Sequence, residues 1–351
     1  MESIQSPQRR NRYLKLKMAL FLTAVFAGKI TPRKLWNVFA CTMSYLLQRK
    51  ISGASPFVLS LELWNECNAG CLFCRNEKGV IFNINPEQPT LGVISKGKMP
   101  APMAMDIIDQ VKKDVLVAVL YTNGEPLLYK ELPNVIRFAS QRKVMTMISS
   151  NGLLFTPENA KAILEAGIDF IKIQLSGFTQ DIYSVQIRYG HVEKLKSNIR
   201  MLAEMKKQGG HHTLILIDYI LYNYNKHQAP LVQAMCQELG LLYNTRPGNP
   251  KGGLEGKEPL QSTESLPLDM SCDWLWKGIQ VNFNGDILQC CDGVIWSNPK
   301  VYEVYQTGKT NLKSVWNGPA ARNLRITMAT KGRGAIPMCS KCERKGVCFK
   351  W

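Results

Sequence analysis

The hydrophobic pattern between residues 57 and 246 alternates between two periods. Short apolar runs predict six strands, and stretches with apolar residues three or four apart predict amphipathic helices between them. The strands are predicted at 57–63, 115–121, 144–148, 170–176, 213–221 and 241–246, and the helices at 103–113, 131–142, 157–166, 192–208 and 228–239. A helix in each gap implies parallel strands, so we expect an α/β fold that binds its ligand at the carboxyl ends of the strands.

The pattern changes on both sides of this region. Residues 76–102 predict a long loop, and the Gly- and Pro-rich stretch 247–270 predicts a linker. Beyond the linker the periodicity fades and cysteines become frequent. We therefore expect an N-terminal extension at 1–55, a core domain at 56–246, the linker at 247–270 and a small cysteine-rich domain at 271–351.

The first fifty residues are strongly basic. They hold ten Lys or Arg against one acidic residue, and so carry +9 of the formal net charge of +17. The apolar run 18–28 is too short to span a bilayer, which takes about 20 residues. Its charge order suits a secretory signal, but the clustered cysteines downstream indicate a reducing compartment and argue against export.

Apolar residues between 35 and 47 recur at helical spacing with basic residues at both ends. This pattern predicts either an interfacial amphipathic helix or an extension that packs on the core domain. We expect a cytoplasmic protein, with peripheral contact at the inner membrane face as the first alternative, and we do not expect a nucleic-acid partner.

The eleven cysteines are too few for a disulfide scaffold, and most of them lie in clusters. The clusters are Cys67, Cys71 and Cys74; Cys272, Cys290 and Cys291; and Cys339, Cys342 and Cys348. Cys41 and Cys236 stand alone in apolar helical patterns, which is typical of core or surface thiols. Tight spacing in the other groups predicts metal binding.

The first cluster, Cys67-x3-Cys71-x2-Cys74, follows the first predicted strand directly. A four-iron cluster normally takes four thiolates, so three leave one iron with an open site. Zinc is the alternative, but it needs a fourth ligand, and no His precedes His191.

The run from Cys67 to Cys74 resembles the signature of the radical S-adenosylmethionine (SAM) superfamily. Asn123-Gly124-Glu125-Pro126 looks like the family's Gly-Gly-Glu motif, with Asn for the first Gly. The resemblance covers about residues 57–246 and implies a partial (β/α)6 barrel like the TIM barrel. It also implies that SAM binds the open iron of a [4Fe-4S] cluster and is cleaved to a 5′-deoxyadenosyl radical. An electron donor such as flavodoxin or ferredoxin would then be a partner.

The resemblance further implies a set of SAM contacts. These are Asn123, Gly124 and Glu125 at the ammonium, Phe73 beside the adenine, Ser150 and Ser176 at the ribose or carboxylate, and Arg188 at the methionine carboxylate. Ser176-Gly177-Phe178 lacks the Asp that many relatives carry there. Ordinary loop structure is the alternative for Ser150, Ser176 and Arg188. The sequence assigns no further catalytic side chain.

The C-terminal cysteines are similar to the start of the SPASM pattern. The given sequence stops at Trp351, before the remaining SPASM cysteines, so the resemblance implies the shorter "twitch" module of radical SAM inosamine dehydrogenases. That module holds one auxiliary cluster, so two [4Fe-4S] clusters are expected in all. Its expected ligands are Cys272, Cys290, Cys339 and Cys342, with Cys348 in reserve and Cys291 as packing. A zinc ribbon is the structural alternative.

Together these features predict a radical SAM oxidoreductase that oxidises or epimerises a sugar, an aminocyclitol or a similar metabolite. The auxiliary cluster would accept an electron in an oxidation, whereas an epimerisation would need a thiol donor such as Cys291 or Cys348. A peptide-modifying maturase is the alternative, which the helical N-terminus disfavours. A non-catalytic zinc- or iron-binding module that docks on membrane or nucleic acid is the alternative from another class.

Overall fold

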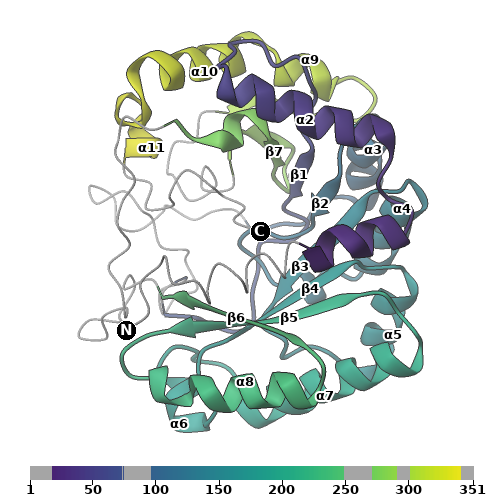
Figure 1. Ribbon diagram of the computed structural model, residues 1–351, viewed down its shortest axis with the longest axis vertical. Coiled ribbons are helices and arrows are strands. Elements are labelled where there is room, and N and C mark those ends of the chain that lie inside the picture. Colours follow the sequence, from purple (N-terminus) through teal and green to yellow (C-terminus); the bar gives the residue numbers. More distant parts are fainter. Residues whose placement is uncertain (1–17, 73, 75–95, 249–270, 291–300, 341–351) are drawn as a thin grey trace.

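The computed structural model describes residues 18–72, 74, 96–248, 271–290 and 301–340 (Figure 1). Its centre is a nine-stranded sheet with the order β6-β5-β4-β3-β2-β1-β7-β8-β9. The first six strands are β1 (Val58–Leu61), β2 (Val117–Val119), β3 (Met145–Ser150), β4 (Phe170–Leu175), β5 (Leu214–Leu221) and β6 (Leu242–Pro247). They pair in parallel in chain order. The predicted α/β fold with a parallel sheet is confirmed.

Helices fill the gaps between these strands and cover one face of the sheet. They are α3 (Ala101–Val111), α4 (Leu132–Gln141), α5 (Pro157–Glu165), α7 (Val192–Gln208) and α8 (Ala229–Glu238). Their ends follow local chemistry, as at α5, where Thr156 and Asn159 form a reciprocal cap. Short elements add to them: α6 (Gln180–Ser184) and the 3₁₀ turns η1 (Pro126–Leu128) and η2 (Lys226–Gln228).

Alternate side chains of each strand point to opposite faces. Ile171 and Ile173 of β4 lie in the main core with the helices, whereas Phe170 belongs to a second apolar cluster that includes Val58 and Leu216. This second face is the inside of the partial barrel. It is apolar near the amino ends of the strands and polar near their carboxyl ends, where Lys172 and Asp218 lie.

The C-terminal region is more regular than the sequence predicts. It contains η3 (Asp273–Trp276), β7 (Gly278–Val281), β8 (Asp286–Leu288), β9 (Val301–Val304), α9 (Leu312–Trp316), α10 (Pro319–Lys331), η5 (Arg333–Ala335) and α11 (Pro337–Ser340). Most of these elements have three to five residues, too few to show a period. β7 pairs in parallel with β1, so this region extends the barrel sheet directly. Residues 249–270, most of the predicted linker, lie outside the described part.

The N-terminal region forms a helix at 18–26 and α2 (Pro32–Leu46). Both pack at the amino ends of the strands, opposite the loop that carries Cys67. Lys29 Nζ lies 2.7 Å from the carboxylate of Asp169, just before β4, and both side chains are buried. Lys34 donates to the carbonyl of Lys143, just before β3. The helix predicted at 35–47 is therefore present and contacts the core domain. Within the described residues, no helix is long and apolar enough to cross a membrane.

Candidate active site

The loop after β1 carries Cys67, Cys71 and Cys74, all half-buried. A second loop, at residues 186–189, pairs with it through backbone contacts. Cys71 and Ile187 form an antiparallel bridge, and the backbone N–H of Leu72 donates to the carbonyl of Gln186 over 2.9 Å. Arg188 therefore lies in the segment that pairs with the cysteine loop, on the same side of the barrel as the three thiols.

Gly70 shows how tightly these two loops pack. Its φ is +61°, and a Cβ there would lie 2.6 Å from the ring of Tyr189. The N–H of Tyr189 also donates to the carbonyl of Ala69 over 3.1 Å. Both the conformation and the space at this position require glycine.

Glu125 joins three strand ends. Its carboxylate accepts hydrogen bonds from the hydroxyl of Ser150 (2.8 Å) and from the backbone N–H groups of Asn151 (2.8 Å) and Leu127 (3.1 Å). Its own N–H donates to the carbonyl of Glu66 over 2.8 Å, in the cysteine loop. Burial, opposed by these donors, raises the pKa of Glu125 to about 7. The four bonds fix the site, and one acceptor position of the carboxylate remains for a ligand.

Gly124 lies where the β2 loop meets the cysteine loop. A Cβ on Gly124 would stand 1.9 Å from the carbonyl oxygen of Trp64. No side chain fits there without moving the backbone of one loop. The next residue back, Asn123, donates to the carboxylate of Glu62 over 3.2 Å. The motif Asn123-Gly124-Glu125 is thus packed directly against the chain that leads to Cys67.

The loop after β3 reaches the first thiol. Asn151 Nδ2 lies 3.7 Å from Cys67 Sγ and 2.8 Å from Asn68 Oδ1. Ser150 is buried and accepts from the N–H of Gly152 while it donates to Glu125. In this structure Ser150 therefore positions Glu125.

At the end of β4, Ser176 is buried, and its hydroxyl has no hydrogen-bond partner among the described residues. Its carbonyl accepts from Asn225 over 2.7 Å. Gln186, in the loop that contacts the thiols, is fully buried, and both ends of its amide also lack a partner in the described part. Buried polar atoms of this kind normally have partners, so they mark where a polar ligand fits.

The sequence assigned no role to four residues of this site: Glu62, Asn151, Gln186 and Tyr189. Glu62 could have been predicted as a site residue. Ser60 and Glu62 alternate with Leu59, Leu61 and Leu63 just before the cysteine loop, which indicates a polar face on this strand. The other three are far from the thiol loop in sequence, and the fold brings them into contact with it. Phe73, the predicted adenine contact, lies outside the described residues.

Charged side chains lie on the inner face of the barrel, on the neighbouring strands β4, β5 and β6. Arg246 Nε lies 2.7 Å from Asp218 Oδ2, and Asn244 donates to Asp218 Oδ1 over 3.0 Å. The ammonium of Lys172 lies 5.6 Å from the ring centre of Tyr121. Burial alone would raise the pKa of Asp218, but Arg246 and Lys172 together lower it, so this carboxyl stays ionised. We call Lys172, Asp218, Asn244 and Arg246 the inner charged layer.

The described C-terminal cysteines gather on one side of the barrel. Cys272 and Cys290 pack on the apolar cluster around Trp274, and Cys272 and Cys339 pack on the cluster around Trp276. Burial raises the pKa of the Tyr302 hydroxyl, and the nearby thiols of Cys290 and Cys339 add to this. Cys342 and Cys348, like Cys291, lie outside the described residues. Cys41 and Cys236, expected as core or surface thiols, are buried, and burial raises the pKa of each to about 12.

The residues present fit SAM and an iron–sulfur cluster. Three thiols, a buried carboxylate and the glycine contact at residue 124 lie at adjoining strand ends. The polar groups of Ser176 and Gln186 that lack partners in the described part belong to the same region. Among the described residues, no three His, Cys, Asp or Glu side chains converge on one metal ion. The donor set suits a multi-iron cluster, because each thiolate then binds a different iron.

Comparisons with known proteins agree with this arrangement. The radical SAM superfamily matches residues 61–227, and an iron–sulfur cluster-binding domain, SPASM, matches residues 272–343. A PqqA peptide cyclase of Granulibacter bethesdensis is 24% identical over 53% of this chain and 45% of its own length. A probable GTP 3′,8-cyclase of Methanocaldococcus jannaschii is 22% identical over 52% of this chain and 56% of its own length. The chain thus spans about half the length of the curated relatives it matches.

Solved structures share the fold at low identity. Streptococcus suis SuiB bound to S-adenosylmethionine is 16% identical, with a TM-score of 0.58 over 80% of this chain and 70% of its own. BtrN in complex with AdoMet and 2-DOIA is also 16% identical, with a TM-score of 0.52 over 84% of this chain and 98% of its own. The two matched domains imply SAM and iron–sulfur clusters as cofactors. The chain therefore carries a radical SAM domain at residues 61–227 and a SPASM iron–sulfur domain at residues 272–343.

Proposed function

We propose that this protein uses SAM to abstract a hydrogen atom from a polar small metabolite, such as a sugar or an aminocyclitol, and so oxidises or epimerises it. SAM, bound at the cluster held by Cys67, Cys71 and Cys74, supplies the 5′-deoxyadenosyl radical. We infer the substrate class from the inner charged layer, which lies on the inner face of the barrel.

The inner charged layer contains both signs of charge. Lys172 and Arg246 supply N–H donors, Asp218 supplies an acceptor, and Asn244 bonds to Asp218. A ligand with several hydroxyl groups, or with a carboxylate or phosphate, can bond to the ammonium of Lys172 and to the remaining N–H groups of Arg246, whereas an apolar ligand would bury these charges without new hydrogen bonds. This favours a hydroxylated or anionic metabolite.

Oxidation of an alcohol carbon requires two steps. Transfer of the carbon-bound hydrogen gives 5′-deoxyadenosine and a substrate radical, and loss of one electron and one proton then gives the carbonyl. The auxiliary cluster, for which we propose Cys272, Cys290, Cys339 and Cys342 as ligands, would accept that electron. Epimerisation would instead need a thiol donor, for which Cys291 and Cys348 are the candidates. Flavodoxin or ferredoxin would reduce the SAM-binding cluster.

Peptide modification is the second candidate. Its support is that matched relatives include a PqqA peptide cyclase and that SuiB has been solved bound to its precursor peptide SuiA. Within the described part, residues 18–50 hold two helices and no strand, and we expected a strand-rich domain there in a peptide-binding relative. This favours a metabolite over a peptide.

The test is anaerobic reconstitution followed by a substrate screen. We expect about eight irons per chain for two four-iron clusters, and 5′-deoxyadenosine on reduction. A substrate deuterated at the reacting carbon should pass deuterium into 5′-deoxyadenosine. Zinc as the only metal with no SAM turnover would establish the non-catalytic module instead. Turnover of a precursor peptide, with all polar metabolites inert, would establish the peptide-modifying candidate.

Variants test the inner charged layer directly. Lys172→Met should lower substrate turnover at least tenfold and leave substrate-independent SAM cleavage intact, because Lys172 lies on β4, outside the two loops that carry and contact the three cysteines. Lys194→Met, on the exposed face of α7, removes the same charge and should change neither rate. Equal turnover in the wild type and both variants would show that the inner charged layer is not part of the substrate site.

We also propose that the protein is cytoplasmic and contacts the inner membrane face through residues 1–50. Large exposed apolar side chains between residues 18 and 51 support this contact, as does the basic charge of the segment.

A further inference from the structure

The N-terminal helix α2 has its polar and apolar faces reversed. Its buried side chains are Lys34, Asn37, Cys41 and Ser44, which follow one another at helical spacing. Trp36, Phe39 and Leu46 are instead 68%, 54% and 63% exposed. Helices on a soluble domain normally turn the apolar stripe to the core.

The preceding helix repeats this reversal. Phe21, Val25 and Phe26 are exposed, the last at 76%, while Thr23 and Ala24 are buried. Of the fifteen large hydrophobic side chains exposed in the described residues, eleven lie between residues 18 and 51. We define the N-terminal apolar face by Phe21, Phe26, Trp36, Phe39 and Leu46. Exposed apolar side chains that are concentrated in one segment in this way indicate an interaction site.

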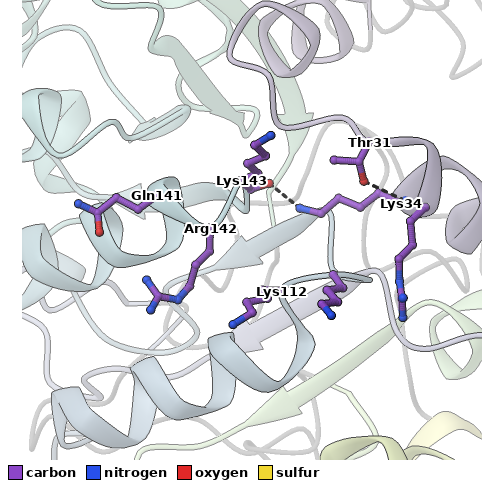
Figure 2. Close-up of a pocket in the computed structure, with 8 residues that line it drawn as sticks. Thr31, Lys34, Lys112, Gln141, Arg142 and Lys143 are labelled. Carbon is purple, nitrogen blue, oxygen red and sulfur yellow. Dashed lines mark hydrogen bonds between the residues drawn. The ribbon is translucent and has the colours of Figure 1, made fainter.

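A basic hollow of about 500 Å³ lies beside this face, where α2 begins and α3 and α4 end. Its cations are Arg33, Lys34, Lys112, Lys113, Arg142 and Lys143. Figure 2 shows Lys34 directed at the backbone of Lys143, with Lys112 and Arg142 nearby. The residues that line it include no acid.

The balance of charge around the basic hollow is positive. Asp109 pairs with Lys112 and Arg142, and Asp114 pairs with Arg33 and Lys313. For the exposed Lys113 and Lys143, the described residues provide no ion pair. Burial, together with the charges of Lys29 and Lys143, lowers the pKa of Lys34 to about 8. A bound anion would relieve this repulsion.

Apolar aromatic side chains next to clustered cations match one kind of surface in particular. An anionic bilayer offers acyl chains to the apolar face and phosphate groups to the cations, and Trp is favoured at such an interface. We propose that the N-terminal apolar face lies in an anionic lipid bilayer and that the basic hollow receives a lipid phosphate. This rests on the peripheral membrane contact proposed above and adds a defined headgroup site.

Vesicle flotation of the full-length holoenzyme tests the proposal. We expect the protein to float with phosphatidylcholine vesicles that contain phosphatidylglycerol and far less with phosphatidylcholine alone. K113Q/K143N should lower flotation with the anionic vesicles about tenfold or more, since each basic residue near such a surface contributes to binding. Asn suits position 143, where φ is +59°.

Two further variants separate the possible outcomes. K194Q/K207Q removes two exposed lysines from α7, at the opposite end of the view from α2 (Figure 1), and should float like the wild type. W36S/F39S should lose flotation through the apolar face. If K113Q/K143N floats like the wild type while W36S/F39S does not, the headgroup site is refuted and the membrane contact stands. If the wild type does not float with anionic vesicles, both are refuted.

Discussion

The hydroxyl of Ser150 donates a 2.8 Å hydrogen bond to the carboxylate of Glu125, so one side-chain pair joins the end of β3 to the loop after β2. The same carboxylate holds the N–H of Asn151, whose side chain reaches Cys67. A change at Glu125 therefore acts on the cysteine loop as well as on any ligand.

Glu125→Gln tests this connection. Its amide nitrogen must face at least one of the donors that now bind the carboxylate, and a buried donor without an acceptor costs about 1–3 kcal/mol. We expect a lower melting temperature and SAM affinity weakened about tenfold, measured by equilibrium dialysis on the reconstituted protein. Glu165→Gln, exposed on α5, is the control. Unchanged stability and affinity would show that Glu125 does not hold the site together.

Gly124→Ala should displace the cysteine loop. The added methyl would overlap the carbonyl of Trp64, and a misplacement of about 1 Å at a reacting centre can cost about a hundredfold in rate. We expect 5′-deoxyadenosine formation to fall by that order. Gly53→Ala, whose Cβ would meet only the end of the Arg49 side chain at 3.7 Å, should leave the rate unchanged. A normal rate in Gly124→Ala would mean that the two loops separate easily.

Substitution of single cysteines should show that the iron is bound at two separate sites. Cys71→Ala should abolish SAM cleavage and keep the iron of the SPASM domain. Cys339→Ala should lose that iron and keep SAM cleavage that is uncoupled from substrate. Each variant should hold about four irons, measured by iron analysis and Mössbauer spectroscopy, against about eight in the wild type. Loss of the same iron in both would refute the two-site division.

Lys29→Met should loosen the N-terminal helices. It leaves the buried carboxyl of Asp169 without its cation, and breaking one side of a buried pair costs about 3–5 kcal/mol. We expect a clearly lower melting temperature and faster proteolysis near residues 18–46. The exposed pair of Lys161 and Glu165, at 3.8 Å, offers the comparison, because Lys161→Met should cost less than about 1 kcal/mol. The double variant Lys29→Met/Asp169→Asn should recover part of the loss.

Stability should depend on the ionisation of Lys34. Burial lowers its pKa from 10.5 to about 8, so above pH 8 the folded protein releases this proton before the unfolded chain does. This group therefore adds stability as the pH rises from 8 towards 10.5, and the contribution is lost as the pH falls through 8. The melting temperature of the wild type relative to Lys34→Met should rise between pH 7.5 and pH 9.5. A constant difference would show that Lys34 is not desolvated.

The barrel could be predicted from sequence because its main helices are long enough to show a period and its short strands lie within longer apolar runs, as β2 does at 115–121. The run at 192–208, for example, matches α7 at both ends. The α6 helix, with five residues, and β8, with three, are too short for such a signal. The reversed face of α2 was also beyond prediction, because spacing reveals a stripe but not which side of it meets the protein.

The site divides in the same way. Cys67, Cys71 and Glu125 were found through local spacing at strand ends, which parallel strands bring to one edge. The backbone bridge between Cys71 and Ile187 joins residues more than a hundred positions apart, and no local pattern predicts such a pairing. The amide of Gln186, which has no partner among the described residues, lies in the same pairing and could not be predicted either.

The parallel pairing of β1 with β7 has a consequence for biosynthesis. Val58 pairs with Val117 on one edge and with Gly278 on the other. The second edge of β1 must therefore stay open on the ribosome until about 220 more residues have been made. An open strand edge can pair with the wrong strand. Pairing with β7 is delayed because closing so long a loop costs entropy. Chaperone dependence should accordingly be greatest for nascent chains that end before residue 278.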